Sequence, residues 1–265
     1  MEIPAVPLLD REEVYRRLDP SGMRERLRRL GHQCREAYRA AQALPLPSGY
    51  RSVRRVLIAG MGGSAIGGEL LSDWAAAQGS ALPITVWRDE GLPPWADQET
   101  LVIISSYSGE TAEALSAFTK ALRRGLLVVA LTAGGRLAQE ARERGIPLLS
   151  CGPPSGEPRL ALGYGLCMPL GLLARWGLLP EARQQVEEAA SLLERLGDEY
   201  GPHTPLTRNP AKALAGRLHG RQIVVFGGGL LSGAARRWKT DLNENAKGWA
   251  FCELLPEAFH NTIEG

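Results

Sequence analysis

Four hydroxyl side chains lie within seven positions of the segment SSYSGETAEAL: Ser105, Ser106, Ser108 and Thr111. Gly109 between them permits the tight backbone of a turn between a strand and a helix. Hydroxyl groups and free N–H groups at the start of a helix are good ligands for anions. The segment therefore predicts a cradle for a compact dianion, although hydroxyls in this place can also serve only to cap the helix that follows.

A glycine-rich turn, GMGGSAIGG, provides a second predicted anion site. It follows residues 56–59, a short apolar run without helical periodicity that is typical of a buried strand. The helix predicted to begin near Ser64 points its free N–H groups at this turn. Together the two turns would surround one dianion with N–H groups and hydroxyls. A tight turn without any ligand is the alternative.

The same turn also fits the dinucleotide-binding fingerprint G-x-G-x-x-G/A through Gly60, Gly62 and Ala65. Asp89 or Glu90, at the end of the next predicted strand, would then bind the ribose. Dinucleotide-binding folds seldom need a second polar cradle at the neighbouring strand, which favours the phosphate interpretation. A nicotinamide-dependent oxidoreductase stays an alternative function.

An alternation of strands and helices positions the two turns. Strands are predicted at residues 56–59, 84–87, 101–105, 127–132 and 146–149, and helices at 64–77, 111–124 and 136–144. Strands separated by helices of this length form a parallel sheet that helices cover on both faces. Ligands of such sheets bind at the carboxyl ends of the strands, where both turns lie. Further helices are predicted from residue 159 to 200, after the loop CGPPSGEP.

The segment RQIVVFGGGLLSGAARRWKTDLNENAKG repeats the strand, glycine-rich turn and helix of the first unit. Gly60 aligns with Gly227 and Gly62 with Gly229, which indicates an internal duplication. Only WAFCELLP is left as a further strand, so the second unit is expected to be incomplete. We therefore expect an N-terminal helical segment at residues 1–48, a first unit with its following helices at 49–200, and a partial second unit at 201–265.

Residues 10–42 are predicted to be helical, with a break at Pro20 and with Asp10 and Ser21 as N-caps. One face carries apolar side chains at three- and four-residue intervals and should pack on the body of the protein. The other face carries several arginines, as nucleic-acid-binding surfaces do. Glu25 and Glu36 interrupt these arginines and no aromatic platform accompanies them, so we expect a solvated face and no nucleic-acid partner.

Composition and charge place the chain among ordinary globular proteins: 44% of its residues are hydrophobic, 23% are charged, and the net charge is +2. Four cysteines without a C-x-x-C pair predict reduced thiols and a cytoplasmic location. We expect neither an export signal nor a membrane span, because the N-terminal segment is acidic and broken by prolines and no apolar tract is long enough. The histidines show no metal-ligand spacing, so no metal and no cofactor are expected.

The motifs GMGGSAIGG and SYSGET resemble those of the sugar isomerase (SIS) fold, which binds phosphosugars. NENAKGWAFCELLPEAFHNTIEG is similar to a segment of the bifunctional phosphoglucose/phosphomannose isomerase family, and the resemblance runs from about residue 54 to residue 265. It implies an α/β protein of two SIS-type units, each with a parallel β-sheet flanked by helices in a flavodoxin-like sandwich, the second one incomplete. The residues that match the family's phosphate site are Gly63, Ser64, Ser106, Ser108 and Thr111.

The resemblance also implies a catalytic set of Arg159, Glu244 and His260. An aldose and a ketose interconvert when a proton moves between neighbouring carbons, so a carboxylate such as Glu244 must remove it and return it through a cis-enediolate. The Arg159 guanidinium can offset the charge of that intermediate. His260 can exchange a proton with the ring oxygen, and in the family it comes from the neighbouring subunit, which implies a homodimer. On residue type alone, each of the three could be a solvated surface side chain.

We therefore expect an isomerase of glucose 6-phosphate and fructose 6-phosphate, with mannose 6-phosphate as a further expected substrate. The family's sequences continue beyond the HN motif and supply a lysine near the C-terminus that takes part in ring opening. The lysines of this chain, Lys120, Lys212, Lys239 and Lys247, do not align with that position, so we expect a C-terminally shortened member. A non-catalytic SIS protein that binds sugar phosphates is accordingly a second hypothesis.

Overall fold

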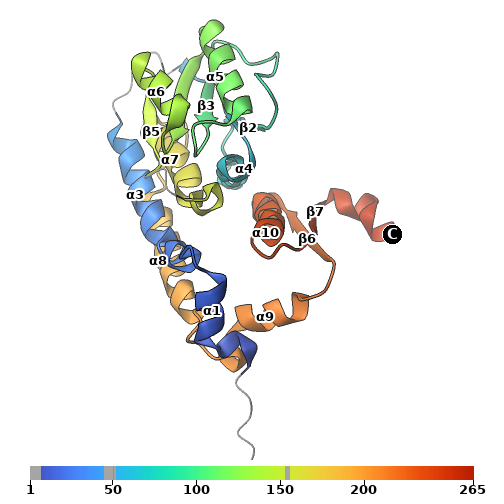
Figure 1. Cartoon of the computed structure of the whole chain (residues 1–265). Coiled ribbons are helices and arrows are strands. Elements are labelled where there is room, and N and C mark those ends of the chain that lie inside the picture. The colour runs from blue at the N-terminus through green and yellow to red at the C-terminus, as the bar shows by residue number, and fades with distance from the viewer. Residues whose placement is uncertain (1–6, 45–49, 51, 153–155) are drawn as a thin grey trace, which may run out of the picture.

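A five-stranded parallel sheet forms the centre of the first unit of the computed structural model, which describes residues 7–44, 50, 52–152 and 156–265 (Figure 1). Its strands are β1 (Arg55–Gly60), β2 (Ile84–Trp87), β3 (Thr100–Ser105), β4 (Leu127–Thr132) and β5 (Leu148–Ser150). The predicted strands are confirmed, but β5 starts two residues later than expected. Ile146 belongs instead to the turn that ends the preceding helix, where its N–H donates to the carbonyl oxygen of Ala141 at 2.8 Å.

Helices cover both faces of this sheet, as the alternation of strands and helices predicts. They are α3 (Leu30–Ala43), α4 (Gly62–Ala77) and α7 (Leu162–Arg175) on one face and α5 (Ala112–Arg123) and α6 (Gly135–Glu143) on the other. Successive side chains of a strand point to opposite faces, so Ile58 packs under the first group of helices and Leu57 under the second. The central strands are buried on both sides, which explains their unbroken apolar sequence.

The strand order is β2-β1-β3-β4-β5, so β1 and β3 are neighbours and the helices that follow them cover opposite faces. This is the flavodoxin-like order, whereas classic dinucleotide-binding sheets have the order 3-2-1-4-5-6. Ligands of flavodoxin-like sheets bind at the switch point between β1 and β3. The two predicted anion-binding turns, which follow β1 and β3, therefore lie side by side at that point.

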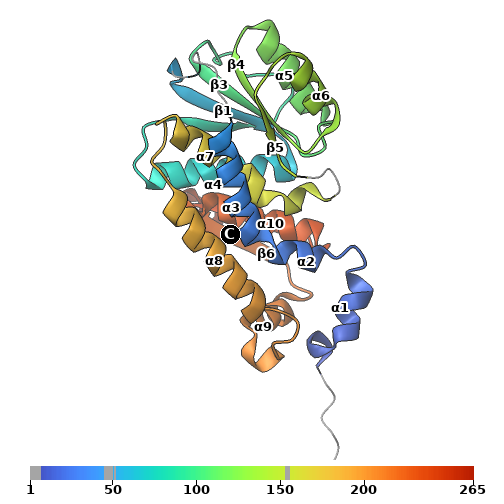
Figure 2. The same cartoon turned by 90° about the vertical axis from the view of Figure 1, so that its left-hand side faces the viewer.

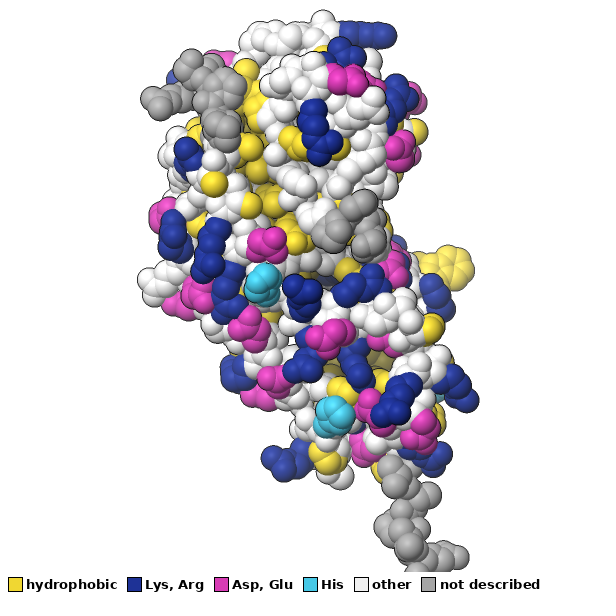
Figure 3. Space-filling view, turned by 60° about the vertical axis from the view of Figure 1, so that its left-hand side comes forward, with side chains coloured by type: hydrophobic (Ala, Val, Ile, Leu, Met, Phe, Trp, Pro, Cys, Tyr) yellow, Lys and Arg dark blue, Asp and Glu magenta, His cyan; other side chains and the backbone are white. Residues whose placement is uncertain are grey.

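The N-terminal segment folds into α1 (Glu12–Leu18), α2 (Met23–Arg28) and α3, and α3 runs beside the long helix α8 (Arg183–Glu199) (Figure 1, Figure 2). Arg35 on α3 forms ion pairs with Glu187 and Glu194 on α8, and its guanidinium also donates to Ser191 Oγ at 3.0 Å. Positive and negative side chains are interspersed over this side of the molecule (Figure 3). Arg35, one arginine of the N-terminal segment, is thus engaged in ion pairs within the chain.

The two predicted N-caps of this segment are wrong. Asp10 pairs instead with the ammonium group of Lys212 at 2.8 Å, a contact between distant segments that local sequence does not reveal. Asp19 takes the place of Ser21, because its carboxylate accepts two N–H groups at the start of α2. The positively polarised N–H groups at a helix start favour a carboxylate over a neutral hydroxyl.

The second unit contains α9 (Pro210–Leu218), β6 (Ile223–Gly228), α10 (Ser232–Glu244) and β7 (Ala250–Leu255). β6 and β7 pair as a two-stranded parallel sheet. Gly229 after β6 has a φ of 54° and Gly62 after β1 has a φ of 48°, so the two aligned glycines share a left-handed backbone conformation, which supports the predicted duplication. On one face of this sheet Val224, Phe226 and Phe251 are between 43% and 51% exposed.

The two units meet through α4 and α10 (Figure 1). The carboxylate of Glu69 on α4 pairs with Arg88 at 2.6 Å and with Arg236 on α10 at 3.2 Å. The carboxylate of Asp73, one turn further along α4, accepts the N–H of Gly233 at the start of α10 at 2.6 Å. Charged and hydrogen-bonded contacts therefore hold the second unit along one side of α4.

Some expectations concern residues that the structure does not describe. The predicted boundary between residues 48 and 49 lies there, as does the central part of the loop CGPPSGEP, residues 153–155. In the described part of the chain, none of the helices combines the length and the apolar character that crossing a bilayer requires.

Candidate functional site

The turn between β1 and α4 brings backbone N–H groups to the carboxyl edge of the sheet. α4 begins at Gly62, two residues before the predicted start at Ser64, and the left-handed φ of Gly62 is one that glycine adopts without strain. A Cβ atom on Gly63 would lie 3.0 Å from the backbone nitrogen of Arg159, so glycine lets the two segments approach closely. The turn thus presents a helix N-terminus and also contacts the segment that carries Arg159.

The turn between β3 and α5 is tied to the first turn by hydrogen bonds. The N–H of Tyr107 donates to Ser64 Oγ at 3.0 Å, and Ser105 Oγ donates to the carbonyl oxygen of Ser64 at 2.7 Å. Within the second turn, Ser106 Oγ donates to Thr111 Oγ1 at 3.0 Å. The structure therefore brings the serine-rich and glycine-rich turns together, with hydroxyls of both at one edge of the sheet.

Helix capping accounts for only part of this hydroxyl cluster. Thr111 occupies the N-cap position of α5, yet its side chain accepts no N–H group of that helix. Ser108 Oγ does accept a nearby N–H, that of Glu110, at 3.2 Å. Two helices, α4 and α5, begin at these turns, and the start of a helix favours negative charge. The arrangement suits a compact anion held between two helix ends.

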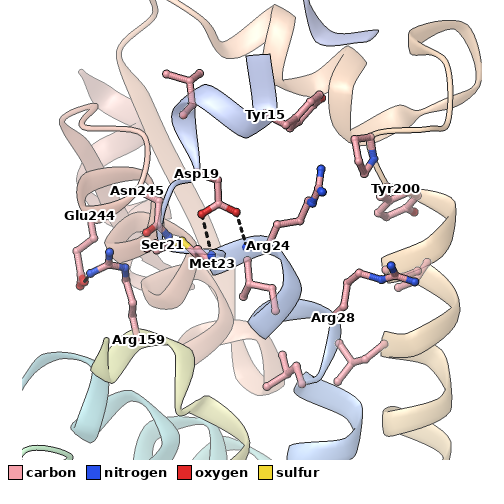
Figure 4. A pocket seen from close by; sticks show the side chains of 18 of the residues that line it. Tyr15, Asp19, Ser21, Met23, Arg24, Arg28, Arg159, Tyr200, Glu244 and Asn245 are labelled. Carbon is pink, nitrogen blue, oxygen red and sulfur yellow. Dashed lines mark hydrogen bonds and ion pairs between the residues drawn. The ribbon is translucent and has the colours of Figure 1, made fainter. Parts of the chain in front are cut away.

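Arg159 and Glu244 meet where the two units face each other (Figure 4). Arg159 lies in a 3-10 turn (Pro158–Leu160), Glu244 is the last residue of α10, and Arg159 Nη1 is 3.5 Å from Glu244 Oε2. The Arg159 side chain is 21% exposed and that of Glu244 is 40% exposed. Arg159 Nε is buried and has no hydrogen-bond partner among the described residues, whereas the exposed part of the side chain lines the adjoining pocket, so the guanidinium can face a bound ligand there. A carboxylate beside such a guanidinium can remove a proton from carbon while the guanidinium stabilises the resulting oxyanion.

A pocket of about 680 Å³ opens beside this pair, and its walls come from the N-terminal segment and α8 (Figure 4). Asp19, Ser21 and Arg28 are among its lining residues. Periodicity gives no signal for this wall, because a residue that lines a pocket and one that faces solvent occupy the same face of a helix. Arg159 and Glu244 line one side of this pocket. The turn after β1 contacts the backbone of Arg159, so the Arg159 turn lies between the pocket and that anion-binding turn.

His260 is not joined to this group in a single chain. It ends a 3-10 turn (Glu257–His260) after β7, and its side chain is exposed. Within the described part of one chain its imidazole makes no hydrogen bond or ion pair. The role that the resemblance implies for His260 therefore depends on a second chain.

Potential metal and cofactor ligands are scattered. Among the residues that the structure describes, no three His, Cys, Asp or Glu side chains gather in an arrangement that could hold a metal ion. The cysteines are free thiols, and burial raises the pKa of the Cys151 thiol to about 12, so this thiol is a poor ligand or nucleophile near neutral pH.

Residues 207–265 match the family model described as the bacterial phospho-glucose isomerase C-terminal SIS domain. Over 92% of its length the chain is 36% identical to the bifunctional phosphoglucose/phosphomannose isomerase of Caldicellulosiruptor bescii, of which it covers 71%. It is 34% identical to the protein of the same name from Aquifex aeolicus, but spans only 61% of that relative's length. It is also 30% identical to the D-glucosamine-6-phosphate 4-epimerase of Sulfolobus acidocaldarius, with coverage of 87% of this chain and 69% of that one.

Solved structures with the same fold are more distant in sequence. A hypothetical protein from Thermus thermophilus superimposes with a TM-score of 0.69 at 22% identity, covering 97% of this chain and 67% of that chain. At this level of identity the likeness shows the fold alone, which is that of two units with parallel sheets flanked by helices.

Proposed function

This chain belongs to the bifunctional phosphoglucose/phosphomannose isomerase family, and from that premise we propose that it interconverts glucose 6-phosphate and fructose 6-phosphate through a cis-enediolate. Mannose 6-phosphate is the proposed second aldose. The single observation that carries the proposal is the meeting of Arg159 and Glu244, next to the glycine-rich turn after β1 that contacts the backbone of Arg159. The proposed location is the cytoplasm, in keeping with four free thiols.

We assign the substrate's phosphate group to the two turns that follow β1 and β3. The proposed ligands are Gly63, Ser64, Ser106, Ser108 and Thr111. Two helix N-termini and preoriented hydroxyls support this assignment. Binding energy from the phosphate, which takes no part in the reaction, then fixes the carbons that react beside Glu244.

Glu244 is the proposed base. Its carboxylate removes the proton from C2 of the aldose and returns it to C1, which gives the ketose, and the same steps run in reverse. The enediolate that forms between the two steps carries negative charge on its oxygens. The Arg159 guanidinium, which lines the pocket beside Glu244, is the donor proposed for one of them.

His260 is the proposed acid and base of ring opening, supplied by the partner chain of a homodimer. Its exposure, together with the exposure of the neighbouring Phe259 and Ile263, supports a contact with a second chain. Co-expression of Glu244→Gln and His260→Ala chains tests this arrangement. In a mixed dimer one site keeps both wild-type residues, so activity is expected to return on mixing two inactive variants, and lack of recovery contradicts the shared site.

A proton NMR time course of fructose 6-phosphate with the chain in heavy water tests the function. We expect new aldose signals, with deuterium at C2, and their identity shows whether glucose or mannose 6-phosphate is made. Binding without exchange or turnover would instead indicate a non-catalytic sugar-phosphate-binding protein. Binding of a nicotinamide dinucleotide, with neither binding nor turnover of the sugar phosphate, would indicate an oxidoreductase.

A phosphorylated amino sugar is a second candidate substrate, because one relative is named D-glucosamine-6-phosphate 4-epimerase. The phosphate-binding turns and the Arg159–Glu244 pair suit this substrate class as well. A parallel sample with glucosamine 6-phosphate distinguishes the two, since only an epimerase produces the 4-epimer. The higher identity to the isomerases favours the first candidate.

A further inference from the structure

Arg237 connects the two elements that carry Arg159 and Glu244. It lies on α10, two turns before Glu244, and its side chain is only 12% exposed. Its Nη2 atom donates to the backbone carbonyl oxygen of Arg159 at 2.6 Å. Its Nε atom lies 2.9 Å from Oδ2 of Asp241, one turn further along the same helix. The guanidinium is therefore fixed on α10 by one of its nitrogens and holds the Arg159 turn with another.

Asp241 is itself held in place. The side-chain amide of Asn245 donates to Asp241 Oδ1 at 3.2 Å, so both carboxylate oxygens have partners. Arg237, Asp241 and Asn245 recur at four-residue intervals and so share one face of the end of α10. Glu244, the last residue of α10, lies in the same helical turn as Asp241 and Asn245.

The Arg159 turn depends on contacts with other segments of the chain to keep its conformation. It is a single 3-10 turn of three residues, and turns of this kind have poor hydrogen-bond geometry of their own. Gly63 contacts its backbone, and the Gln33 side-chain amide on α3 donates to the carbonyl oxygen of Leu160 at 3.1 Å. From the second unit, Arg237 donates to the carbonyl oxygen of Arg159. The ion pair of Arg159 with Glu244 is long at 3.5 Å and partly exposed, so it contributes little to holding the turn.

We infer that Arg237 is a positioning residue for the isomerisation proposed above, on which this inference rests. It clamps the backbone of the Arg159 turn to α10, so that the Arg159 guanidinium and the Glu244 carboxylate reach the same two carbons of the substrate. Arg237 acts on the backbone and has no contact with substrate. Misplacement by about 1 Å can lower a rate by about 10²-fold, which sets the scale of the effect.

Arg237→Gln tests the clamp, and Arg236→Gln is the matched control. Arg236 is the preceding residue on α10 and pairs with Glu69 across the same interface, without contact to Arg159. We expect Arg237→Gln to lower kcat about 10²-fold, with KM within about threefold of wild type, because phosphate binding is remote. The kcat of the Arg236→Gln variant is expected to stay close to that of the wild-type chain. Equal losses in the two variants would reduce Arg237 to a general interface contact and overturn the inference.

A double variant separates positioning through Arg159 from an independent effect. In an Arg159→Gln background the clamp has no guanidinium to position, so adding Arg237→Gln is expected to lower kcat by less than about threefold. A further fall of about 10²-fold there would show that Arg237 acts without Arg159, contrary to the inference. Arg237→Lys, which can still reach the carbonyl oxygen, is expected to recover part of the loss.

A crystal structure of Arg237→Gln keeps the inference testable without turnover. We expect the distance between Arg159 Nη1 and Glu244 Oε2 to exceed the 3.5 Å of the wild-type chain, with the two turns after β1 and β3 unchanged. An unchanged distance would overturn the clamp. Absence of turnover in the wild-type chain would overturn the proposed function but not this geometric result.

Discussion

Arg159 Nη1 lies 3.5 Å from Glu244 Oε2, although the two residues come from different units of the chain. The 3-10 turn after the first sheet supplies one, and the end of α10 supplies the other. The site therefore forms only when the units dock, and its proposed chemistry depends on that junction.

Glu244→Gln removes the proposed base and keeps the size of the side chain. We expect kcat to fall about 10³-fold, because general base catalysis contributes on that scale, while binding of fructose 6-phosphate stays nearly intact. Exchange of the C2 proton in heavy water measures the step directly. Glu143→Gln on α6, a surface glutamate, is the control, and undiminished exchange in Glu244→Gln would remove this residue from its role.

Ser108→Ala tests the anion-binding turns. Among the described residues, Ser108 Oγ accepts a hydrogen bond only from the N–H of Glu110, so the substitution should leave the fold intact. We expect KM for the sugar phosphate to rise about 10-fold, since a hydrogen bond to a charged group is lost. Ser116→Ala on α5 removes a hydroxyl further along the same helix and should leave KM unchanged. Equal KM values in both variants would place the phosphate elsewhere.

Gly67→Ala tests the packing of α4 on α7. A Cβ atom on Gly67 would lie 2.4 Å from the carbonyl carbon of Gly165, and backbone cannot move aside as a flexible side chain can. We expect the free energy of unfolding to fall by about 1–3 kcal/mol. Gly216→Ala on α9 has no atom within 4 Å of the new Cβ and should stabilise the chain by about 0.5–1 kcal/mol. Chemical denaturation measures both, and equal effects would contradict the close contact.

The pair of Asp10 and Lys212 gives a pH dependence of stability. The hydrogen bond from Lys212 lowers the pKa of Asp10 below its ordinary value of 3.8. A carboxyl group with a lowered pKa stabilises the fold above its unfolded pKa and loses that contribution as the pH falls through the folded pKa. We expect the midpoint temperature of unfolding to decrease as the pH is lowered below about 4. The decrease should be smaller in Asp10→Asn, which has no carboxyl group to protonate at this position. Identical pH profiles of the two proteins would exclude this linkage.

The sheet and its turns were predictable because their signals are local. Apolar runs bounded by glycine identify buried strands, and the hydroxyls of Ser106 and Thr111 stand next to each other in the turn as their spacing indicates. The strand order β2-β1-β3-β4-β5 came only from the structure, because the same alternation of strands and helices also fits the classic dinucleotide-binding order. The start of α4 was missed by two residues, because Gly62 takes a left-handed φ inside the first turn.

Contacts between distant segments were not predictable from the sequence alone. Asp10 was expected to cap a local helix, but its partner Lys212 comes from α9. The role of α2 and α8 as pocket walls depends on how the units dock, which no periodicity encodes. Arg237 likewise differs from its neighbour Arg236 only in its direction, and that direction is fixed by the packing of α10.

Helix α10 begins at its contact with α4 and ends at Glu244. Its near end is bonded to Asp73 through the N–H of Gly233, and Glu244 stands at its far end, eleven residues on (244 minus 233). At 1.5 Å per residue this part of the helix is about 16 Å long, so a tilt of the helix axis by about 5° about Gly233 would displace Glu244 by about 1.4 Å. Misplacement by about 1 Å can lower a rate about 10²-fold, so the docking of α10 on α4 sets the position of the proposed base closely enough to matter for turnover.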